Sequence, residues 1–190
     1  MSSAPIPSIS PEQYLEAERA ADQKHEYWYG EVFAMAGGSP RHSFIINNVQ
    51  GVLTSGLRGR PCFVFNADLR VAVSWDELIT YPDVTVLCGL PQYADDKRDT
   101  LTNPTMVVEV LSPSTAKTDR GDKVFQYRRV PSMREILLVD PAPTTIEHYW
   151  KLPNGHWEVE TITDPSAVLR FPHLDIDVPV AEIYRNVELL

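Results

Sequence analysis

Long apolar runs, a targeting signal and an excess of positive charge are all missing from this 190-residue chain. No stretch approaches the roughly 18 consecutive apolar residues that a membrane-spanning helix needs. The N-terminus has neither the basic nor the apolar region of a secretory signal. The formal net charge of -9 argues against broad, nonspecific affinity for nucleic acid. We therefore expect a cytoplasmic protein that makes no membrane contact.

Cysteine is also scarce, since Cys62 and Cys88 are the only two, and each lies beside a strand-like run. We interpret both as small buried hydrophobic residues rather than as a disulfide or as metal ligands. Hydrophobic residues make up 43% of the chain, which is ordinary for a globular protein. The length fits a single domain, which we place at residues 10–190 after a flexible leader at 1–9.

Apolar periodicity predicts alternating helices and strands. Helices are expected at residues 11–21, 40–57, 116–130 and 179–186. Strands are expected at residues 25–36 (a hairpin that turns at Gly30), 62–66, 68–74, 81–87, 104–112, 135–140, 144–151 and 156–163. The third helix connects two strands as a crossover, which favours parallel pairing of those strands. The fold class is therefore α/β: a mixed β-sheet with helices on both sides.

One long polar stretch, residues 88–103, has no predicted element. An irregular segment of this length is unusual in a compact domain. We expect it to be either mobile or functional.

Two acidic residues interrupt the apolar strand patterns. Asp83 lies near the start of the run 81–87, and Glu109 lies near the end of the run 104–112. If the strands pair antiparallel with Asp83 opposite Glu109, both carboxylates lie on one face at the same edge of the sheet. Like charges in this position repel, and a bound cation would remove the repulsion. Oxygen ligands of this kind suit Mg²⁺, with Mn²⁺ as an alternative.

A downstream lysine supplies a third element. Asp119, Lys123 and Tyr127 are spaced four residues apart, so they share one face of a helix. We expect Lys123 to reach the carboxylates, where it would orient a water nucleophile or offset charge on a phosphate. The segment 112–134 holds six Lys and Arg residues against two Asp residues, which is compatible with a phosphate-bearing substrate. Two carboxylates, a metal and a lysine suit phosphodiester hydrolysis.

Several short motifs together resemble a known family. Pro82-Asp83, followed by Glu109-Val110-Leu111-Ser112, is similar to the core of the PD-(D/E)XK nuclease superfamily. The ordered set over residues 10–186 resembles the bacterial Uma-two family of endonucleases more closely. The segments that carry this resemblance are 30–38, His42, 81–84, 108–115, 119–123, 127–129 and 138–141.

The resemblance implies a restriction-endonuclease-like fold and metal-dependent hydrolysis of DNA. The superfamily places its lysine two residues after the acid, where this chain has Leu111, so the resemblance implies that Lys123 replaces it. Asp83 and Glu109 would bind the metal, with the Val110 carbonyl as a third ligand. The implied supporting groups are His42, Asp68, Ser112 and Tyr127. Duplex cleavage by this fold usually needs two active sites, so a symmetric homodimer is also implied.

The candidate side chains other than Glu109, which stands between Val108 and Val110, each have a plainer interpretation. Asp83 could simply open a strand after a proline, and Lys123 could pair only with Asp119 on an exposed helix. The supporting groups could be a helix cap or surface residue (His42), turn residues (Asp68 and Ser112) and a residue at the edge of the core (Tyr127). The four tryptophans are scattered along the chain. We interpret them as packing residues, not as a surface on which bases stack.

Two other functions are compatible with the sequence. One is a nuclease-like domain that binds or regulates a partner without cleaving, which the acidic charge and the lack of an evident DNA-reading helix favour. The other is a metal hydrolase for a smaller phosphorylated substrate. Its affinity would depend less steeply on salt than that of a nuclease.

Overall fold

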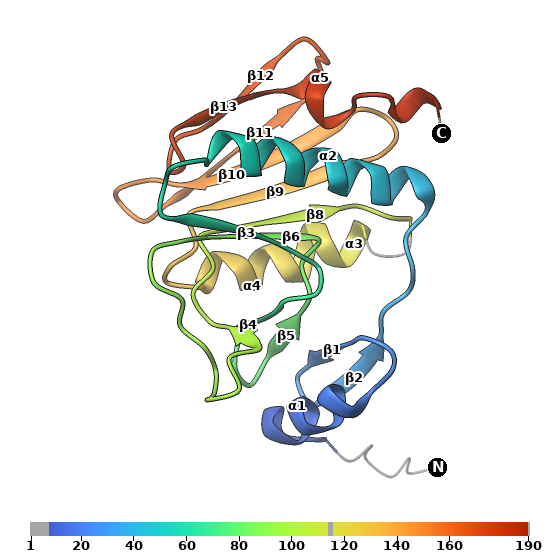
Figure 1. Cartoon of the computed structure of the whole chain (residues 1–190), viewed down its shortest axis with the longest axis vertical. Coiled ribbons are helices and arrows are strands. Elements are labelled where there is room, and N and C mark those ends of the chain that lie inside the picture. The colour runs from blue at the N-terminus through green and yellow to red at the C-terminus, as the bar shows by residue number, and fades with distance from the viewer. Residues whose placement is uncertain (1–7, 114–115, 190) are drawn as a thin grey trace.

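A six-stranded mixed sheet forms the centre of the molecule (Figure 1). The computed structural model describes residues 8–113 and 116–189. The strands of this sheet, in spatial order, are β11 (Trp157–Ile162), β10 (Thr145–Lys151), β9 (Glu135–Asp140), β8 (Met106–Val110), β6 (Val84–Cys88) and β3 (Cys62–Asn66). β8 and β9 are parallel, and the other neighbours are antiparallel. The predicted crossover is confirmed.

Helices cover both faces of this sheet. α2 (Pro40–Gly56) begins after the N-cap Ser39 and buries Ile45, Val49 and Leu53 against one face. α4 (Val124–Arg129) packs against the other face, and Figure 1 shows the two helices on opposite sides of the strands. Burying one such aliphatic side chain contributes about 2 kcal/mol. The predicted fold class, a mixed sheet between helices with additional hairpins, is confirmed.

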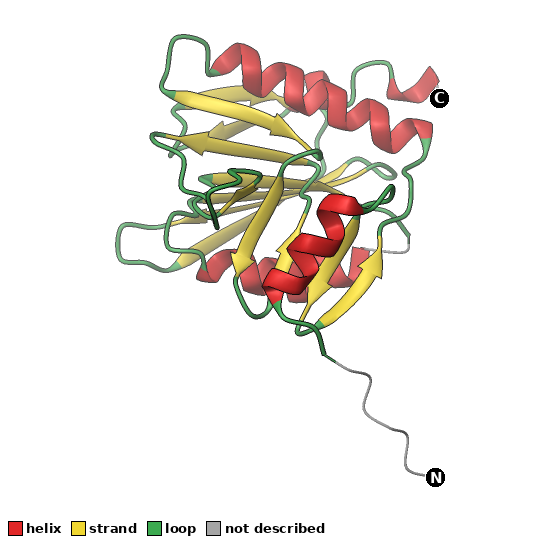
Figure 2. Ribbon diagram, turned by 60° about the horizontal axis from the view of Figure 1, so that its bottom comes forward, coloured by secondary structure: helices red, strands yellow, loops and turns green. Residues whose placement is uncertain are grey.

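A second sheet of five strands lies beside the first. In spatial order its strands are β2 (Glu31–Ala34), β1 (His25–Trp28), β5 (Leu78–Thr80), β4 (Arg70–Ser74) and β7 (Thr100–Leu101). α1 (Pro11–Ala20) lies across these strands (Figure 2) and buries Tyr14 and Leu15 against them. The β1–β2 hairpin turns at Tyr29 and Gly30, whose φ angles are 45° and 88°, so the predicted turn at Gly30 is confirmed.

The remaining elements lie at the C-terminal end. β12 (Val168–Phe171) pairs with β13 (Ile176–Pro179), and neither strand was predicted. They are followed by α5 (Val180–Ile183) and the 3-10 turn η2 (Val187–Leu189), so the helix predicted at 179–186 is shorter than expected. No helix within the described ranges combines the length and apolar character needed to cross a membrane. Most of the predicted leader, residues 1–7, lies outside the described residues.

The helix predicted at 116–130 is not a continuous α-helix. It consists of α3 (Ala116–Thr118), a π-helical turn η1 (Asp119–Lys123) and α4. π turns of this kind are frequently found at functional sites. Ser114 and Thr115, which belong to the motif 108–115, lie outside the described residues.

The segment 88–103 is held to the fold more firmly than the sequence predicted. It contains β7, which pairs in parallel with β4. Asp99 accepts hydrogen bonds from Arg19 and Arg70, and Asp95 accepts one from Arg19. These contacts fasten the segment to α1 and β4, away from the acidic pair.

The cysteines were interpreted wrongly. Cys62 and Cys88 are directly opposite each other in the β3–β6 pair, and they form a disulfide. Opposite residues in an antiparallel pair have neighbouring Cβ atoms. Only the pairing of β3 with β6 brings the two thiols together, and periodicity along the chain does not contain that information.

Reduction of the disulfide should destabilise the protein. The bond joins residues 26 positions apart, and closing a loop of this size stabilises the folded state by about 3 kcal/mol. Urea denaturation with and without reductant should show a loss of this size. Cys62→Ala should show the same loss and no further response to reductant. An unchanged wild-type midpoint in reductant would contradict the bond.

Acidification should weaken the contacts of Asp99. Arg19 and Arg70 hold the pKa of Asp99 down to about 2, below the value of about 3.9 for an unfolded chain. Because the folded-state pKa is depressed, the stabilisation is present above about pH 4 and is lost as the pH falls toward 2. Asp99→Asn should therefore cost about 1 kcal/mol at neutral pH, since the carboxylate is partly exposed and screened.

Urea denaturation between pH 7 and pH 2.5 would test this dependence. The cost of Asp99→Asn should shrink as the pH falls. Asp177→Asn is the control, because its ion pair with Arg170 lies on the exposed surface. An equal cost of Asp99→Asn across the whole range would contradict the prediction.

Candidate active site

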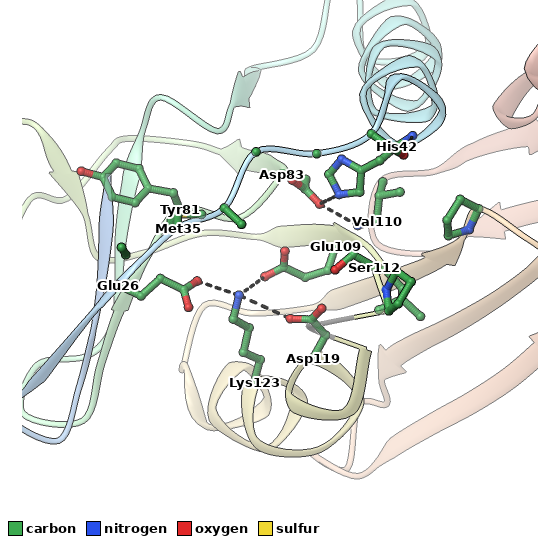
Figure 3. A pocket seen from close by; sticks show the side chains of 18 residues that line it. Glu26, Met35, His42, Tyr81, Asp83, Glu109, Val110, Ser112, Asp119 and Lys123 are labelled. Atoms are coloured by element: carbon green, nitrogen blue, oxygen red, sulfur yellow. Dashed lines mark hydrogen bonds and ion pairs between the residues drawn. The ribbon is translucent and has the colours of Figure 1, made fainter. Parts of the chain in front are cut away.

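A cavity of about 500 Å³ opens where the two sheets meet (Figure 3). Its walls come from the β1–β2 hairpin, the N-terminus of α2, the end of β8 and the turn η1. The functional side chains that line it are Glu26, His42, Asp83, Glu109, Asp119 and Lys123. Elements far apart in the sequence therefore contribute to one site.

The register of β6 and β8 brings the acidic pair together. Val84 lies opposite Val108 and Thr85 opposite Val107, so the next step along the ladder places Asp83 beside Glu109. This is the register predicted from the sequence. Asp83 stands just before β6, and its Oδ2 accepts a hydrogen bond of 2.7 Å from the backbone N–H of Val110.

Lys123 is the buried cation of the site. Its side chain lies within a group of carboxylates and the residue is 5% exposed. Its Nζ is 2.7 Å from Glu26 Oε1, and 3.4 Å from both Glu109 Oε1 and Asp119 Oδ1. The plainer interpretation, a surface pair with Asp119 alone, is wrong because this face of the helix is turned into the protein.

Tyr127 orients the Glu109 carboxylate. Its hydroxyl donates a hydrogen bond to Glu109 Oε1, the same oxygen that lies near Lys123. Asp119, Lys123 and Tyr127 thus share one face of the helix, as their spacing predicted. The π turn between Asp119 and Lys123 does not separate them.

Burial and charge shift the pKa values of these groups. Burial raises the pKa of Glu109 above its ordinary value, although the Lys123 ammonium opposes this shift. Burial alone would lower the pKa of Lys123, but its carboxylate neighbours outweigh burial and raise it. Burial and the charge of Glu109 raise the pKa of Tyr127 well above its ordinary value. Lys123 therefore stays charged, and Tyr127 keeps the proton that it donates.

His42 lies on the Asp83 side of the cavity. Its Nε2 is 3.5 Å from Asp83 Oδ2, and the hydrogen bond with Asp83 raises the pKa of His42. A Cβ on Gly38 would lie 2.4 Å from His42 Nδ1, so a side chain at position 38 would displace the ring. The glycine-rich approach to α2 therefore leaves room for the imidazole.

Not all of the implied supporting groups reach the cavity. Ser112 lines it, and Tyr127 contacts it through Glu109. Asp68 is not among the lining residues: its side chain is 76% exposed and forms an ion pair with Lys24. The Asn66 side chain donates a hydrogen bond to the Asp68 carboxylate and accepts one from the backbone N–H of Asp68. These hydrogen bonds support the interpretation of Asp68 as a turn residue.

Two acidic residues of the site were missed as functional groups. Glu26 belongs to the second sheet, and its apolar and aromatic neighbours in the sequence indicate only a strand. Asp119 was used for its helical spacing alone. The available signal for Glu26 was an acidic residue within a strand of otherwise aromatic residues. Its partner, Lys123 on η1, is apparent only from the tertiary structure.

The basic character of segment 112–134 is largely neutralised by acids from elsewhere. Arg120 pairs with Asp140 and Glu147, and Arg129 pairs with Glu77. Lys123 is buried among acids. The expected basic patch for a phosphate-bearing substrate is therefore not formed by these side chains.

The oxygen donors of the cavity fit a divalent cation. Among residues 8–113 and 116–189, no three His, Cys, Asp or Glu side chains are grouped closely enough to hold a metal by themselves. Two carboxylates with a nearby backbone carbonyl suit Mg²⁺, which usually keeps several water ligands. The cavity also has four carboxylates for one ammonium and one imidazole. A cation would offset negative charge that burial makes costly.

Comparisons of the sequence identify relatives over nearly the whole chain. The Uma2 family model, described as "Putative restriction endonuclease", matches residues 11–180. The uncharacterized protein slr1290 of Synechocystis is 37% identical over 187 residues, covering 97% of this chain and 96% of the relative. A second Synechocystis protein, sll1609, is 32% identical and covers 86% of this chain and 93% of its own length.

A solved structure has the same fold. It is the crystal structure of "a putative nuclease belonging to DUF820" from Anabaena variabilis, with a TM-score of 0.76 and 18% identity. The match covers 94% of this chain and 99% of the other. The family model, which matches residues 11–180, shows that the chain belongs to the Uma2, or Uma-two, family.

Proposed function

We propose that this protein is a metal-dependent endonuclease that hydrolyses DNA phosphodiester bonds. Its membership in a family described as "Putative restriction endonuclease" supports a nuclease. The observation that carries the finer proposal is the buried Lys123 ammonium, which lies 3.4 Å from the Glu109 carboxylate in a cavity that Asp83 also lines.

Each side chain has a role in this proposal. Asp83 and Glu109 bind Mg²⁺ (or Mn²⁺), with the Val110 carbonyl as the third protein oxygen. The backbone N–H of Val110 and the hydroxyl of Tyr127 orient the two carboxylates. When bound, the cation polarises the phosphate and activates a water molecule for attack.

Lys123 offsets the negative charge that develops on the phosphate in the transition state. Its charge and position are maintained by Glu26 and Asp119, which lie on either side of its amino group. A lysine held between acids keeps its proton, so it acts as a fixed positive charge rather than as a base. His42 acts on the other side of the cavity, where it restrains Asp83.

Cleavage of both strands of a duplex by this fold usually needs two active sites. We therefore expect a symmetric homodimer in which each copy supplies one active site. We expect the protein to act on DNA in the cytoplasm, where its Cys62–Cys88 disulfide would be an exception to the usual reduced state of thiols.

Removal of the site residues should abolish cleavage. Glu109→Ala and Lys123→Gln should each lower the rate of plasmid nicking in Mg²⁺ by about 100-fold or more, since each removes a charge that acts on the reacting phosphate. Asp68→Ala is the matched control, because this acid lies outside the cavity. Circular dichroism would establish that the variants are folded. Cleavage that persists in both site variants would contradict the assignment.

Metal binding should depend on Asp83. Calorimetric titration with Mg²⁺ should give a binding heat for the wild type and none for Asp83→Asn, which keeps the shape of the side chain but loses its charge. Asp68→Asn should behave as the wild type. If the wild type binds neither Mg²⁺ nor Mn²⁺, the alternative of a nuclease-like binding or regulatory module would be favoured.

A further inference from the structure

A second cavity, of about 610 Å³, adjoins the candidate active site. Both cavities are lined by Glu26, Asp119 and Lys123, so these side chains form the partition between them. We call the second cavity the hairpin groove, because its walls are the β1–β2 hairpin and the helical segment 118–123. The proposed hydrolysis does not use it.

The register of the hairpin determines which side chains line the groove. Glu26 lies opposite Phe33, and Trp28 lies opposite Glu31. Opposite residues share a face of a sheet, as do residues two apart on one strand, so all four belong to the same face. Glu26 contacts Lys123, so this face is turned toward η1. The opposite face of the hairpin packs beneath α1.

The groove has aromatic walls formed by Trp28, Tyr29 and Phe33. Phe33 is 48% exposed and Tyr29 is 59% exposed, so neither side chain is enclosed by the core. The Tyr29 hydroxyl accepts a 2.7 Å hydrogen bond from Gln126, which restrains its ring. Trp28 does pack against the core, as the sequence predicted, but it also lines the groove. Exposed aromatic groups beside an active site indicate a binding surface.

The polar part of the groove is acidic. Glu31 and Asp122 add their carboxylates to those of Glu26 and Asp119. These groups repel phosphate, so the groove does not suit a nucleic-acid backbone. Carboxylates do accept hydrogen bonds from the amino groups of bases, and aromatic side chains stack on bases of any sequence. The combination fits a nucleobase.

We infer that the hairpin groove binds an unpaired nucleobase of the substrate strand, next to the phosphodiester in the candidate active site. The inference rests on the proposed nuclease function and adds to it a preference for DNA with an unpaired nucleotide near the cleaved bond. A paired base cannot enter, because its faces are stacked and its hydrogen-bonding edge is occupied. The acceptors of the groove favour bases that carry an amino group over thymine.

A base in the groove would also contact the machinery around Lys123. The indole N–H of Trp28 lies 3.4 Å from Glu26 Oε2, and Glu26 Oε1 lies 2.7 Å from Lys123 Nζ. Stacking on Trp28 would therefore restrain Glu26 and, through it, the lysine. The Trp28–Glu26 and Glu26–Lys123 contacts would therefore connect binding of the base with the position of the Lys123 ammonium.

The test compares two fluorescein-labelled DNA duplexes of one sequence, fully paired or with a single unpaired guanine. Anisotropy measures binding, and gel electrophoresis measures cleavage in Mg²⁺. The wild type should bind the unpaired DNA about tenfold more tightly, a factor typical of one stacked base. Phe33→Ala should remove this preference. Phe63→Ala should keep it, because Phe63 is a comparably exposed (52%) phenylalanine on β3, outside the groove. Thymine in place of the unpaired guanine should bind more weakly.

The outcomes separate this inference from the proposed function. Equal binding of both duplexes by the wild type, or a preference that survives Phe33→Ala, overturns the inference even if both duplexes are cleaved. Absence of Mg²⁺-dependent cleavage contradicts the nuclease, while a binding preference that depends on Phe33 would still support the groove. A second copy of the chain could also cover the groove. If Phe33→Ala converts a dimer into a monomer by light scattering, the groove is an interface and the inference is overturned.

Discussion

The buried ammonium of Lys123 is the constraint on which the rest of the site depends. Removing a charge from water costs several kcal/mol unless partners compensate for it. The partners come from three places: Glu26 from the hairpin, Glu109 from the central sheet and Asp119 from the π turn. Lys123 therefore links the two sheets through its contacts with Glu26 and Glu109. These contacts hold the Lys123 ammonium in the cavity between the two sheets, close to Glu109.

The surplus of carboxylates around this lysine determines what the site can bind. One ammonium does not neutralise four acids: burial raises the pKa of Glu109 against the opposing charge of Lys123, and the charges of Asp83 and Asp119 add to the increase. A divalent cation on the Asp83 side, as we propose, would offset this charge, whereas a phosphate without a cation would be repelled. On the hairpin side, the same acids favour a neutral ligand with N–H donors. In these proposals the two cavities share a negatively charged wall and differ in ligand because the proposed cation lies only on the Asp83 side.

Much of the central fold could be predicted because it depends on local periodicity. Alternation along the two acidic strands led to the β6–β8 register and hence to the meeting of Asp83 with Glu109. Spacing along the following helix placed Lys123 and Tyr127 on one face. The π turn was not predicted, since an insertion of this kind changes hydrogen bonding without changing which residues are apolar. The short strands β5 and β7 were missed because each is defined by its partners rather than by its own pattern.

The sequence by itself determined the identity of the acidic pair and the helix face of the lysine, since each depends on a local pattern. It also determined the family, since short motifs follow one another in order along most of the chain. Tertiary structure decided the contacts between distant segments. It paired Cys62 with Cys88, placed Asp68 on the surface, and brought Glu26 to within 2.7 Å of a lysine 97 positions away. Neither the periodicity of apolar residues nor the spacing of residues along the chain encodes such contacts. Such contacts follow from how the two sheets pack. This packing brings the hairpin, the two acidic strands and the lysine helix together in one site.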